Sequence, residues 1–565
     1  MRKLIECVPN FSEGNDMALI AKITDEIQKV EGVKLLDVDP GKATNRTVVT
    51  FVGEPEPVCE AAFRAVKLAG ELIDMSKHHG AHPRFGATDV CPLVPVANIT
   101  MDEVVEYAHK LAKRIGEELH IPIYCYESAA YEEKRKNLAN CRAGEYEGLK
   151  DKLVNPEWKP DFGPAVFDEK VAKTGATAVG ARNFLVAYNV NLNTTSTRRA
   201  NSIAFDVRER GRVKREGNPL TGKIVKDENG NSVYTPGTLK SVKAIGWYIE
   251  EYGIAQISMN LTDITVCSVH KAFEEVCEKA AARGIRVTGS ELVGLVPLQS
   301  LLDAGKYFLK KQHRSTGIAD SEIIKIAVKS LGLDDLKPFD PKKKVIEYLL
   351  ESEDDSKKNL IDMNLKEFAE ETASESPAPG GGSIAAYMGT LGAALGTMVA
   401  NLSSHKRGWD ERWEEFSDWA DKGKYYHDAL VKMVDEDTNA FNKIMNAFGL
   451  PKKTAEEKEI RHKAIQDATK YAIEVPFRTM NLCYESMEVA KAMAEIGNPN
   501  SVSDAGVGAL AACAGVRGAY LNVRINAGSY EDKAFVDDIL AKAKKLNDDA
   551  IAKEKEIMDI VESKL

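Results

Sequence analysis

The sequence lacks paired cysteine motifs. It contains nine cysteines in 565 residues, and no two of them stand in Cys-x-x-Cys spacing. Zinc ribbons and thioredoxin-like redox sites need that spacing. An odd number of cysteines, behind an N-terminus without a secretory hydrophobic region, indicates reduced thiols. We therefore expect a cytoplasmic protein without a disulfide framework.

Concentrated positive charge is also absent. The chain carries 76 Lys and Arg against 86 Asp and Glu, for a net charge of −10, and no stretch forms a basic face. Binding to a phosphate backbone requires such a face, so we expect no nucleic-acid partner. Small acidic ligands stay possible, because a few converging arginines bind a carboxylate whatever the net charge.

Only one long uncharged run is present, over residues 380–402. It approaches the length that spans a bilayer. It is built mainly of Gly, Ala, Ser and Thr, and it lacks an aromatic belt. We interpret it as a tightly packed core helix and expect no membrane partner.

The first half of the chain alternates strand and helix patterns. The first set of strands and helices covers residues 3–8, 17–30, 33–39, 47–53, 57–73 and 89–96, in the order βαββαβ. The second set repeats this order over residues 179–192, 200–207, 242–261 (a hairpin turning near Gly253), 269–282 and 285–296. This order predicts two ferredoxin-like subdomains, each with helices on one face of its sheet. The two remaining faces are expected to meet in a cleft.

Strand patterns end after Pro338, where a charged stretch begins. We expect two α+β subdomains over residues 1–178 and 179–337, a charged linker over 338–363, and an all-α helical bundle over 364–565. The predicted bundle helices cover residues 382–402 and 411–448, with further helices starting after Thr454, Ser486, Ser501 and Asp532.

Three of the ten histidines lie between His78 and Asp89. His78 and His82 have the i, i+4 spacing of a metal pair, but Gly80 and Pro83 oppose the helix that would align them, so we expect no metal. Gly80 and Pro83 restrict the backbone around His82, which makes His82 the candidate general base. A histidine cluster without function is the alternative.

A glycine-rich segment follows, with Gly163-Pro164 and Gly175-Ala176-Thr177 at its ends. Backbone without side chains can approach a flat ligand closely. The alternative is a plain connection between subdomains.

The long helix of the second half places one acid inside an apolar stripe. The stripe recurs at spacings of three and four and consists of Phe416, Trp419, Gly423, Tyr426, Leu430, Met433, Asp437, Phe441, Ile444 and Phe448. A buried carboxyl has a raised pKa or a cationic partner, so Asp437 is a candidate acid–base group, with a structural acid as the alternative. Asp435 lies about 200° away on an ideal helix and is expected to face solvent.

These segments resemble the formiminotransferase-cyclodeaminase family. The matching stretches are residues 8–14, 36–39, 44–47, 82–84, 89–92, 163–164, 175–177, 292–297, 374–383, 435–437, 450–454 and 518–523. The resemblance implies transfer of a formimino group from N-formimino-L-glutamate to tetrahydrofolate, which gives L-glutamate and 5-formiminotetrahydrofolate. It then implies ring closure to 5,10-methenyltetrahydrofolate with loss of ammonia. The co-substrate is expected to be polyglutamylated, and the protein is expected to be a homo-oligomer, a ring of dimers.

The resemblance also implies the roles of particular residues, with His82 and Asp437 catalytic. The expected substrate contacts are Asn10, Asp39, Arg84, Asp89, Gly163, Pro164, Gly175, Ala176, Thr177 and Arg182. Arg84 and Arg182 are expected to pair with substrate carboxylates. The possible cyclodeaminase pocket consists of Gly380, Gly381, Gly382, Ser383, Lys452, Asp504 and Arg524.

The sequence departs from the family pattern at two places. His79 stands where a lysine is common, and the loop between Gly163 and Gly175 is longer than usual. Two alternative functions follow: a non-catalytic folate-binding scaffold, and an enzyme that transfers formyl in place of formimino groups.

Overall fold

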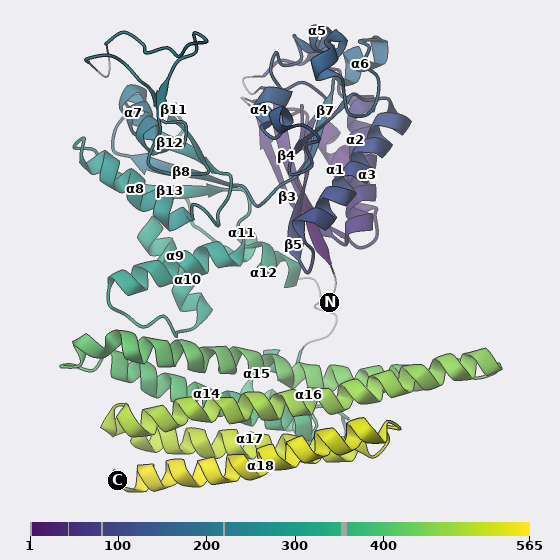
Figure 1. The fold of residues 1–565 in the computed structure, drawn as a ribbon, viewed down its shortest axis with the longest axis vertical. Coiled ribbons are helices and arrows are strands. Elements are labelled where there is room, and N and C mark those ends of the chain that lie inside the picture. The colour runs from purple at the N-terminus through teal and green to yellow at the C-terminus, as the bar shows by residue number, and fades with distance from the viewer. Residues whose placement is uncertain (1–2, 43, 81–82, 219–220, 352–358) are drawn as a thin grey trace. The chain divides into compact units, whose positions relative to one another are not determined.

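The computed structural model describes residues 3–42, 44–80, 83–218, 221–351 and 359–565. The chain forms two compact units (Figure 1). The first unit consists of Met1–Ser300 with Leu331–Ser352, and the second of Leu301–Ser330 with Glu353–Leu565. The first unit mixes strands and helices and the second is helical, so the predicted fold class is confirmed.

The first sheet has seven strands. Its strands are β1 (Leu4–Cys7), β2 (Asn10–Phe11), β3 (Val33–Gly41), β4 (Arg46–Gly53), β5 (Thr88–Ala97), β6 (Ile123–Glu127) and β7 (Thr177–Ala181). The antiparallel order β3-β4-β1-β5 is that of the predicted βαββαβ unit. β7 and β6 extend it as parallel strands. One face packs against α1 (Met17–Gln28), α2 (Pro55–Leu72) and α3 (Met101–Leu119).

The strand expected over residues 179–192 is wrong, because it is two strands. β7 ends at Ala181 in the first sheet, and β8 (Val186–Leu192) begins the second. Both strands are largely buried and only residues 182–185 separate them, so a periodicity argument merges them into one strand. The expected boundary at residue 178 therefore falls inside β7.

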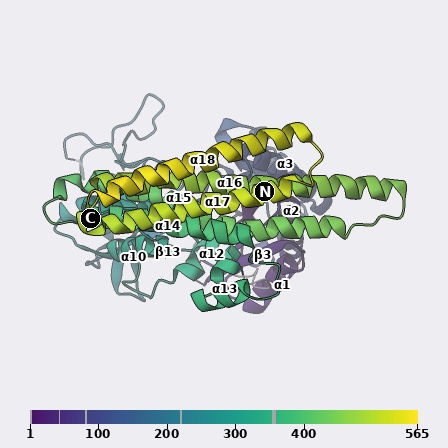
Figure 2. The same cartoon turned by 90° about the horizontal axis from the view of Figure 1, so that it is seen from below.

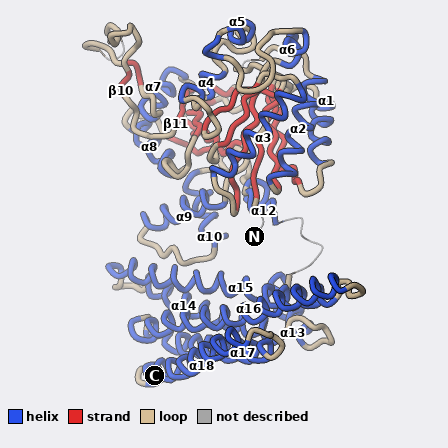
Figure 3. The backbone as a smooth tube through the Cα atoms, turned by 45° about the vertical axis from the view of Figure 1, so that its right-hand side comes forward, coloured by secondary structure: helices blue, strands red, loops and turns tan. Residues whose placement is uncertain are grey.

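The second sheet contains four antiparallel strands in the order β11-β12-β8-β13. The remaining elements are α7 (Thr197–Val207), β11 (Val242–Ile249), β12 (Ile254–Leu261), α8 (Val269–Ala281) and β13 (Val287–Val293). The predicted hairpin is confirmed, and Gly253 in its turn has φ +66°. A small two-stranded insertion, β9 (Arg212–Val213) with β10 (Tyr234–Thr235), was not predicted (Figure 3).

The helical unit is built from long helices that run side by side (Figures 1 and 2). They are α14 (Gly381–Ser404), α15 (Trp413–Phe448), α16 (Ala455–Ile496), α17 (Val502–Ala527) and α18 (Lys533–Glu562), and the short helix α13 (Leu365–Thr372) precedes them. α14, the uncharged run, packs against α15, α16 and α17. α15 and α16 continue as a hairpin beyond the other helices.

The predicted starts after Thr454, Ser501 and Asp532 are confirmed, since Thr454 and Asp532 cap their helices. The start predicted after Ser486 is wrong, because Ser486 lies inside α16. There its hydroxyl donates to the Cys483 carbonyl at 2.7 Å, so this polar side chain is satisfied within the helix.

Residues 301–330 pack with the helical unit, although they were expected in the second α+β subdomain. They include most of α9 (Leu298–Lys311) and α10 (Asp320–Leu331). The Thr316 hydroxyl donates to Asp421 at 2.6 Å, and the His313 ring stacks on Trp413. The first part of the expected linker is also ordered, as α11 (Pro341–Lys344) and α12 (Ile346–Glu351), with Ile346 buried in the first unit.

Candidate active sites

The inner faces of the two sheets enclose a cleft of about 430 Å³, as the sequence predicted. Side chains alternate along β1, so Ile5 and Cys7 enter the core under the helices while Glu6 faces the cleft. Charged groups of both signs line it: Glu6, Asp37, Asp39, Arg46, Arg142, Arg182 and Lys243. Such a lining suits a ligand that carries both carboxylates and cationic nitrogen.

Three of the predicted contact residues, Asn10, Asp39 and Arg182, line this cleft. Asn10 accepts a hydrogen bond from Arg46 Nε at 3.0 Å through its side-chain oxygen. Asp89 is fully buried and pairs with Arg46 and Arg142. Asp89 therefore holds two arginines that line the cleft and does not line it itself.

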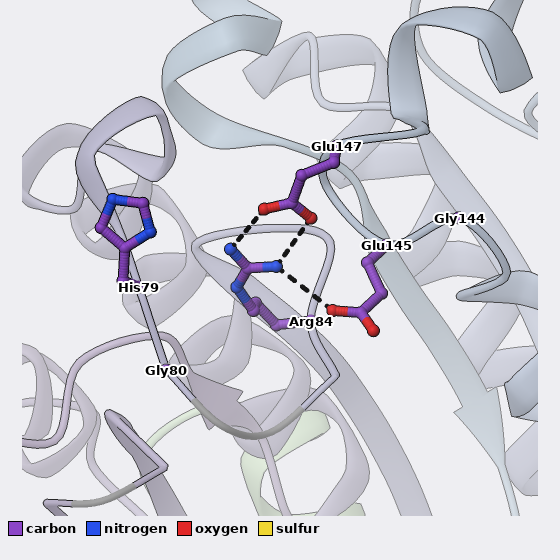
Figure 4. Close-up of a pocket in the computed structure, with 6 residues that line it drawn as sticks. All are labelled: His79, Gly80, Arg84, Gly144, Glu145 and Glu147. Atoms are coloured by element: carbon purple, nitrogen blue, oxygen red, sulfur yellow. Dashed lines mark hydrogen bonds and ion pairs between the residues drawn. The ribbon is translucent and has the colours of Figure 1, made fainter.

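Arg84, expected to pair with a substrate carboxylate, is held in this structure by two acidic side chains. Its guanidinium donates to both oxygens of Glu147, at 2.8 and 2.9 Å, and to Glu145 at 3.3 Å (Figure 4). These bonds occupy both terminal nitrogens. Arg84 instead joins the segment around residue 84 to the loop that carries Glu145 and Glu147.

The three neighbouring histidines have different surroundings. His82, the predicted base, lies outside the described residues. His78 is buried, with Nε2 2.8 Å from the Asn45 carbonyl and Nδ1 accepting from Arg84 Nε, and burial lowers its pKa. His79 is exposed and lines a second pocket of about 510 Å³ beside Arg84 (Figure 4). Within the described ranges no three His, Cys, Asp or Glu side chains gather closely enough to hold a metal.

The glycine-rich segment is held by backbone packing. Gly163 has φ +82°, and a Cβ there would collide with the Ile121 carbonyl. Gly175 has φ +66° and pairs with Gly86, while Thr177 donates to the Thr88 carbonyl at 2.6 Å. Residues 175–177 thus hydrogen-bond to the segment over residues 85–88. Close backbone packing is sufficient to explain why Gly163 and Gly175 are glycines.

Five charged residues of the cleft were missed from the sequence: Glu6, Asp37, Arg46, Arg142 and Lys243. Glu6 is almost fully buried, and desolvation raises its pKa to about 7 against the opposing effect of Arg182. The sequence did contain a signal for Glu6, because it is an acidic residue between Ile5 and Cys7 in a predicted strand. Arg46 and Arg142 had no such signal, because only the tertiary fold brings them to Asp89.

In the helical unit, Asp437 belongs to α15, and its carboxyl lies beside the first turn of α14. Its Oδ2 accepts from the Ser383 hydroxyl at 3.3 Å, and the Ser383 backbone also hydrogen-bonds to the carboxyl. Gly382 touches this carboxyl, since an added Cβ would lie 2.6 Å from Oδ2. Burial raises the pKa of Asp437, and the bonds to Ser383 partly offset the rise. The structure thus brings Gly382, Ser383 and Asp437 together, with Gly381 beside Asn522.

Asp435 does not face solvent as expected. Its carboxylate accepts from the backbone N–H groups of Leu360 at 2.7 Å and Ile361 at 3.4 Å. A segment outside the helix therefore covers this acid, which a helical-wheel argument cannot reveal.

Three further predicted members of the second site form no hydrogen bond or ion pair with Asp437 or Ser383 among the described residues. Lys452 is exposed in the turn between α15 and α16. Asp504 is near the start of α17, about 27 Å along the helix axis from Asn522. Arg524 is exposed, with its guanidinium 5.5 Å from the centre of the Tyr520 ring.

The two sites together define a two-unit enzyme, with a charged cleft in one unit and a half-buried carboxyl at a helix N-terminus in the other. Family models match nearly the whole chain: the formiminotransferase domain, N-terminal subdomain, over residues 4–182, the formiminotransferase domain over 187–351, and formiminotransferase-cyclodeaminase over 364–545. The chain belongs to the formiminotransferase-cyclodeaminase family.

Known relatives cover the chain as a whole and each half separately. Formimidoyltransferase-cyclodeaminase of Gallus gallus is 45% identical over 535 residues, covering 95% of this chain and 94% of the relative. Glutamate formimidoyltransferase of Streptococcus pyogenes is 43% identical and covers 55% of this chain and 94% of the relative. Methenyltetrahydrofolate cyclohydrolase of Methylorubrum extorquens is 40% identical and covers 36% of this chain and 97% of the relative.

Proposed function

We propose that this chain transfers the formimino group of N-formimino-L-glutamate to tetrahydrofolate, and then closes the product to 5,10-methenyltetrahydrofolate with release of ammonia. The observation that carries the proposal is the similarity at 45% identity, over almost the full length, to a formimidoyltransferase-cyclodeaminase. Tetrahydrofolate is the co-substrate, and no metal is needed for either step.

The first reaction takes place in the cleft of the α+β unit. The folate amine attacks the formimino carbon, and the bond from that carbon to the glutamate nitrogen then breaks. A proton leaves the attacking nitrogen and another reaches the departing one, and we assign this transfer to His82. The acidic and basic side chains of the cleft complement the amidinium and carboxylate groups of the donor.

The second reaction takes place beside Asp437. N10 of the folate attacks the formimino carbon, and the terminal nitrogen leaves as ammonia after gaining a proton. The raised pKa of Asp437 favours the protonated carboxyl that this step requires. Ser383 holds the carboxyl through side-chain and backbone hydrogen bonds.

The test supplies tetrahydrofolate and formiminoglutamate and follows methenyltetrahydrofolate absorbance, glutamate and ammonia. His82→Ala is expected to stop glutamate release but to leave ring closure of supplied 5-formiminotetrahydrofolate unchanged. Asp437→Ala is expected to do the reverse. If both variants are folded and each loses both activities, the assignment of the two residues is wrong.

The two alternatives make different predictions. A scaffold would bind folate in calorimetry without turnover, whereas an enzyme that prefers formyl groups would consume N-formylglutamate first when both donors compete. The buried Glu6 and the half-buried Asp437 favour catalysis, because a scaffold gains nothing from desolvated acids.

A homo-oligomer is supported by an exposed apolar face on α17, which contains Val507, Leu510, Leu521 and Ile525. α14 carries a further exposed apolar set, Leu391, Met398 and Leu402. These side chains recur at three- and four-residue spacings or their sums, as in a helix-packing surface. We propose that a second copy covers this face, within a ring of dimers.

We also propose that the protein is cytoplasmic and that its folate is polyglutamylated. Among the described residues all nine cysteines are free thiols, which suits a reducing compartment. Arg182 and Lys243 provide cations in the cleft for an acidic tail. Cell fractionation tests the first proposal, and a lower KM for folate with a longer glutamate chain would support the second.

A further inference from the structure

Two arginines that line the cleft share one buried carboxylate. Oδ2 of Asp89 pairs with two guanidinium groups, that of Arg46 and that of Arg142, the second at 2.8 Å. The side chains of Arg46 and Arg142 are only 8% and 14% exposed, and Asp89 is 0% exposed. A single carboxylate balances one guanidinium, so one buried positive charge has no contacting counter-charge in the described part of the chain. Such a charge is unfavourable until an anion joins it.

The two arginines differ in their remaining donors. Arg46 donates through Nε to Asn10 and through Nη1 to Asp89. Arg142 reaches Asp89 through Nη2, and its buried Nε has no hydrogen-bond partner among the residues described. Both arginines line the cleft, but Arg142 is the more exposed and has no hydrogen bond from Nη1 among the described residues, so it has the greater capacity to bind a ligand there.

The loop that carries Arg142 is tied to the segment that contains the predicted base. Arg142 follows α4 (Leu138–Cys141), and Glu145 and Glu147 in the same loop hold Arg84. Phe85 N donates to Asp89 Oδ1 at 3.1 Å, which attaches that segment to the same carboxylate. Arg142 and the backbone at Phe85 are therefore anchored to the same carboxylate, that of Asp89.

We propose that Arg142 binds a carboxylate of the glutamyl donor and thereby makes the transferase specific for a glutamyl substrate. This inference rests on the proposed function. A guanidinium whose terminal nitrogen is held by Asp89 is oriented before the substrate arrives, and a planar guanidinium can donate two parallel bonds to a carboxylate. Asp89 is then a positioning residue for Arg142.

The test measures kcat/KM of the full-length enzyme for N-formimino-L-glutamate and for its α-amide and γ-amide. Arg142→Gln is expected to lower kcat/KM for the diacid by about tenfold to a hundredfold. For the amide that lacks the bound carboxylate, kcat/KM of the variant is expected to equal that of the wild type. That equality also shows that the variant is folded. Arg142→Lys is expected to recover part of the loss, because lysine keeps the charge but not the bidentate geometry.

Arg135→Gln is the matched control. Arg135 is also buried, pairs with one aspartate, Asp161, and has an unpartnered Nε, but it does not line the cleft. Its replacement is expected to change the diacid and both amides equally. An equal loss for diacid and amides in Arg142→Gln would make Arg142 merely structural and overturn the proposal.

The folate co-substrate also ends in a glutamyl carboxylate. A further arm therefore replaces tetrahydrofolate with tetrahydropteroate, which lacks that group. If Arg142→Gln loses activity only with tetrahydrofolate, the arginine binds the folate tail and the donor assignment is overturned. A wild-type enzyme without any turnover of formiminoglutamate would instead refute the proposed function.

Discussion

Replacing Gly382 with alanine should slow ring closure about 100-fold without unfolding the protein. The Gly382 Cα faces the Asp437 carboxyl, and an added Cβ would lie 2.6 Å from Oδ2 and closer still to Oδ1 and Cγ. Gly382 lies in the first turn of α14 without a positive φ, so alanine is compatible with the backbone. The added methyl group must therefore be accommodated by movement of the carboxyl.

The size of the effect follows from this geometry. The carboxyl must withdraw by about 1 Å to restore ordinary contact, and a displacement of that size costs on the order of 100-fold in rate. Overpacking at this position costs about 1–3 kcal/mol of stability, partly offset by about 1 kcal/mol from the helix propensity of alanine over glycine. The expected result is a folded enzyme that makes glutamate normally but releases ammonia about 100 times more slowly.

Gly381→Ala provides the control for this prediction. An added Cβ at Gly381 would lie 3.5 Å from Asn522 Nδ2, which is an ordinary contact, so both activities should be retained. Stopped assays of glutamate and ammonia on the two variants make the comparison. Equal ammonia release by Gly381→Ala and Gly382→Ala would refute the claim that the Gly382–Asp437 contact positions the acid.

The remaining predictions concern titration and assembly. The pKa of Glu6 is raised to about 7 by burial, so its stabilising contribution is complete below about pH 4.5 and is lost between pH 4.5 and about 7, by up to about 3 kcal/mol. Urea unfolding should show this decline in the wild type, and a decline of the same size in Glu6→Gln would contradict it. The rate of ring closure should fall as pH rises through the raised pKa of Asp437, and in Asp437→Asn the rate should be at least about 100-fold lower; an unchanged pH profile in that variant would exclude Asp437 as the acid. Ile525→Glu, at a side chain 76% exposed on the apolar face, should lower the mass in solution as measured by light scattering, whereas Val154→Glu, 71% exposed on the first unit, should not.

Much of the fold could be predicted because local patterns and tertiary packing agree. The hairpin around Gly253 and the helices that begin after Thr454 and Asp532 carry their own signals, a glycine with positive φ and capping side chains. The break between β7 and β8 could not be predicted, because both strands are largely buried and only residues 182–185 separate them. The same limit applies to residues 301–330, whose helical pattern does not specify which unit they pack against.

In the two sites, too, the sequence determined some features and the tertiary structure determined the others. By itself the sequence determined that Asp437 stands in an apolar stripe, since helical periodicity places a side chain on a face without knowledge of its neighbours. The tertiary structure alone decided what meets that face, with Gly382 and Ser383 against Asp437 and the backbone at Leu360 over Asp435. It also decided that Glu147 holds Arg84, whereas Arg142 pairs with Asp89 and lines the cleft. Ion pairing depends on distances between segments far apart in the chain, and spacing along the sequence does not contain those distances.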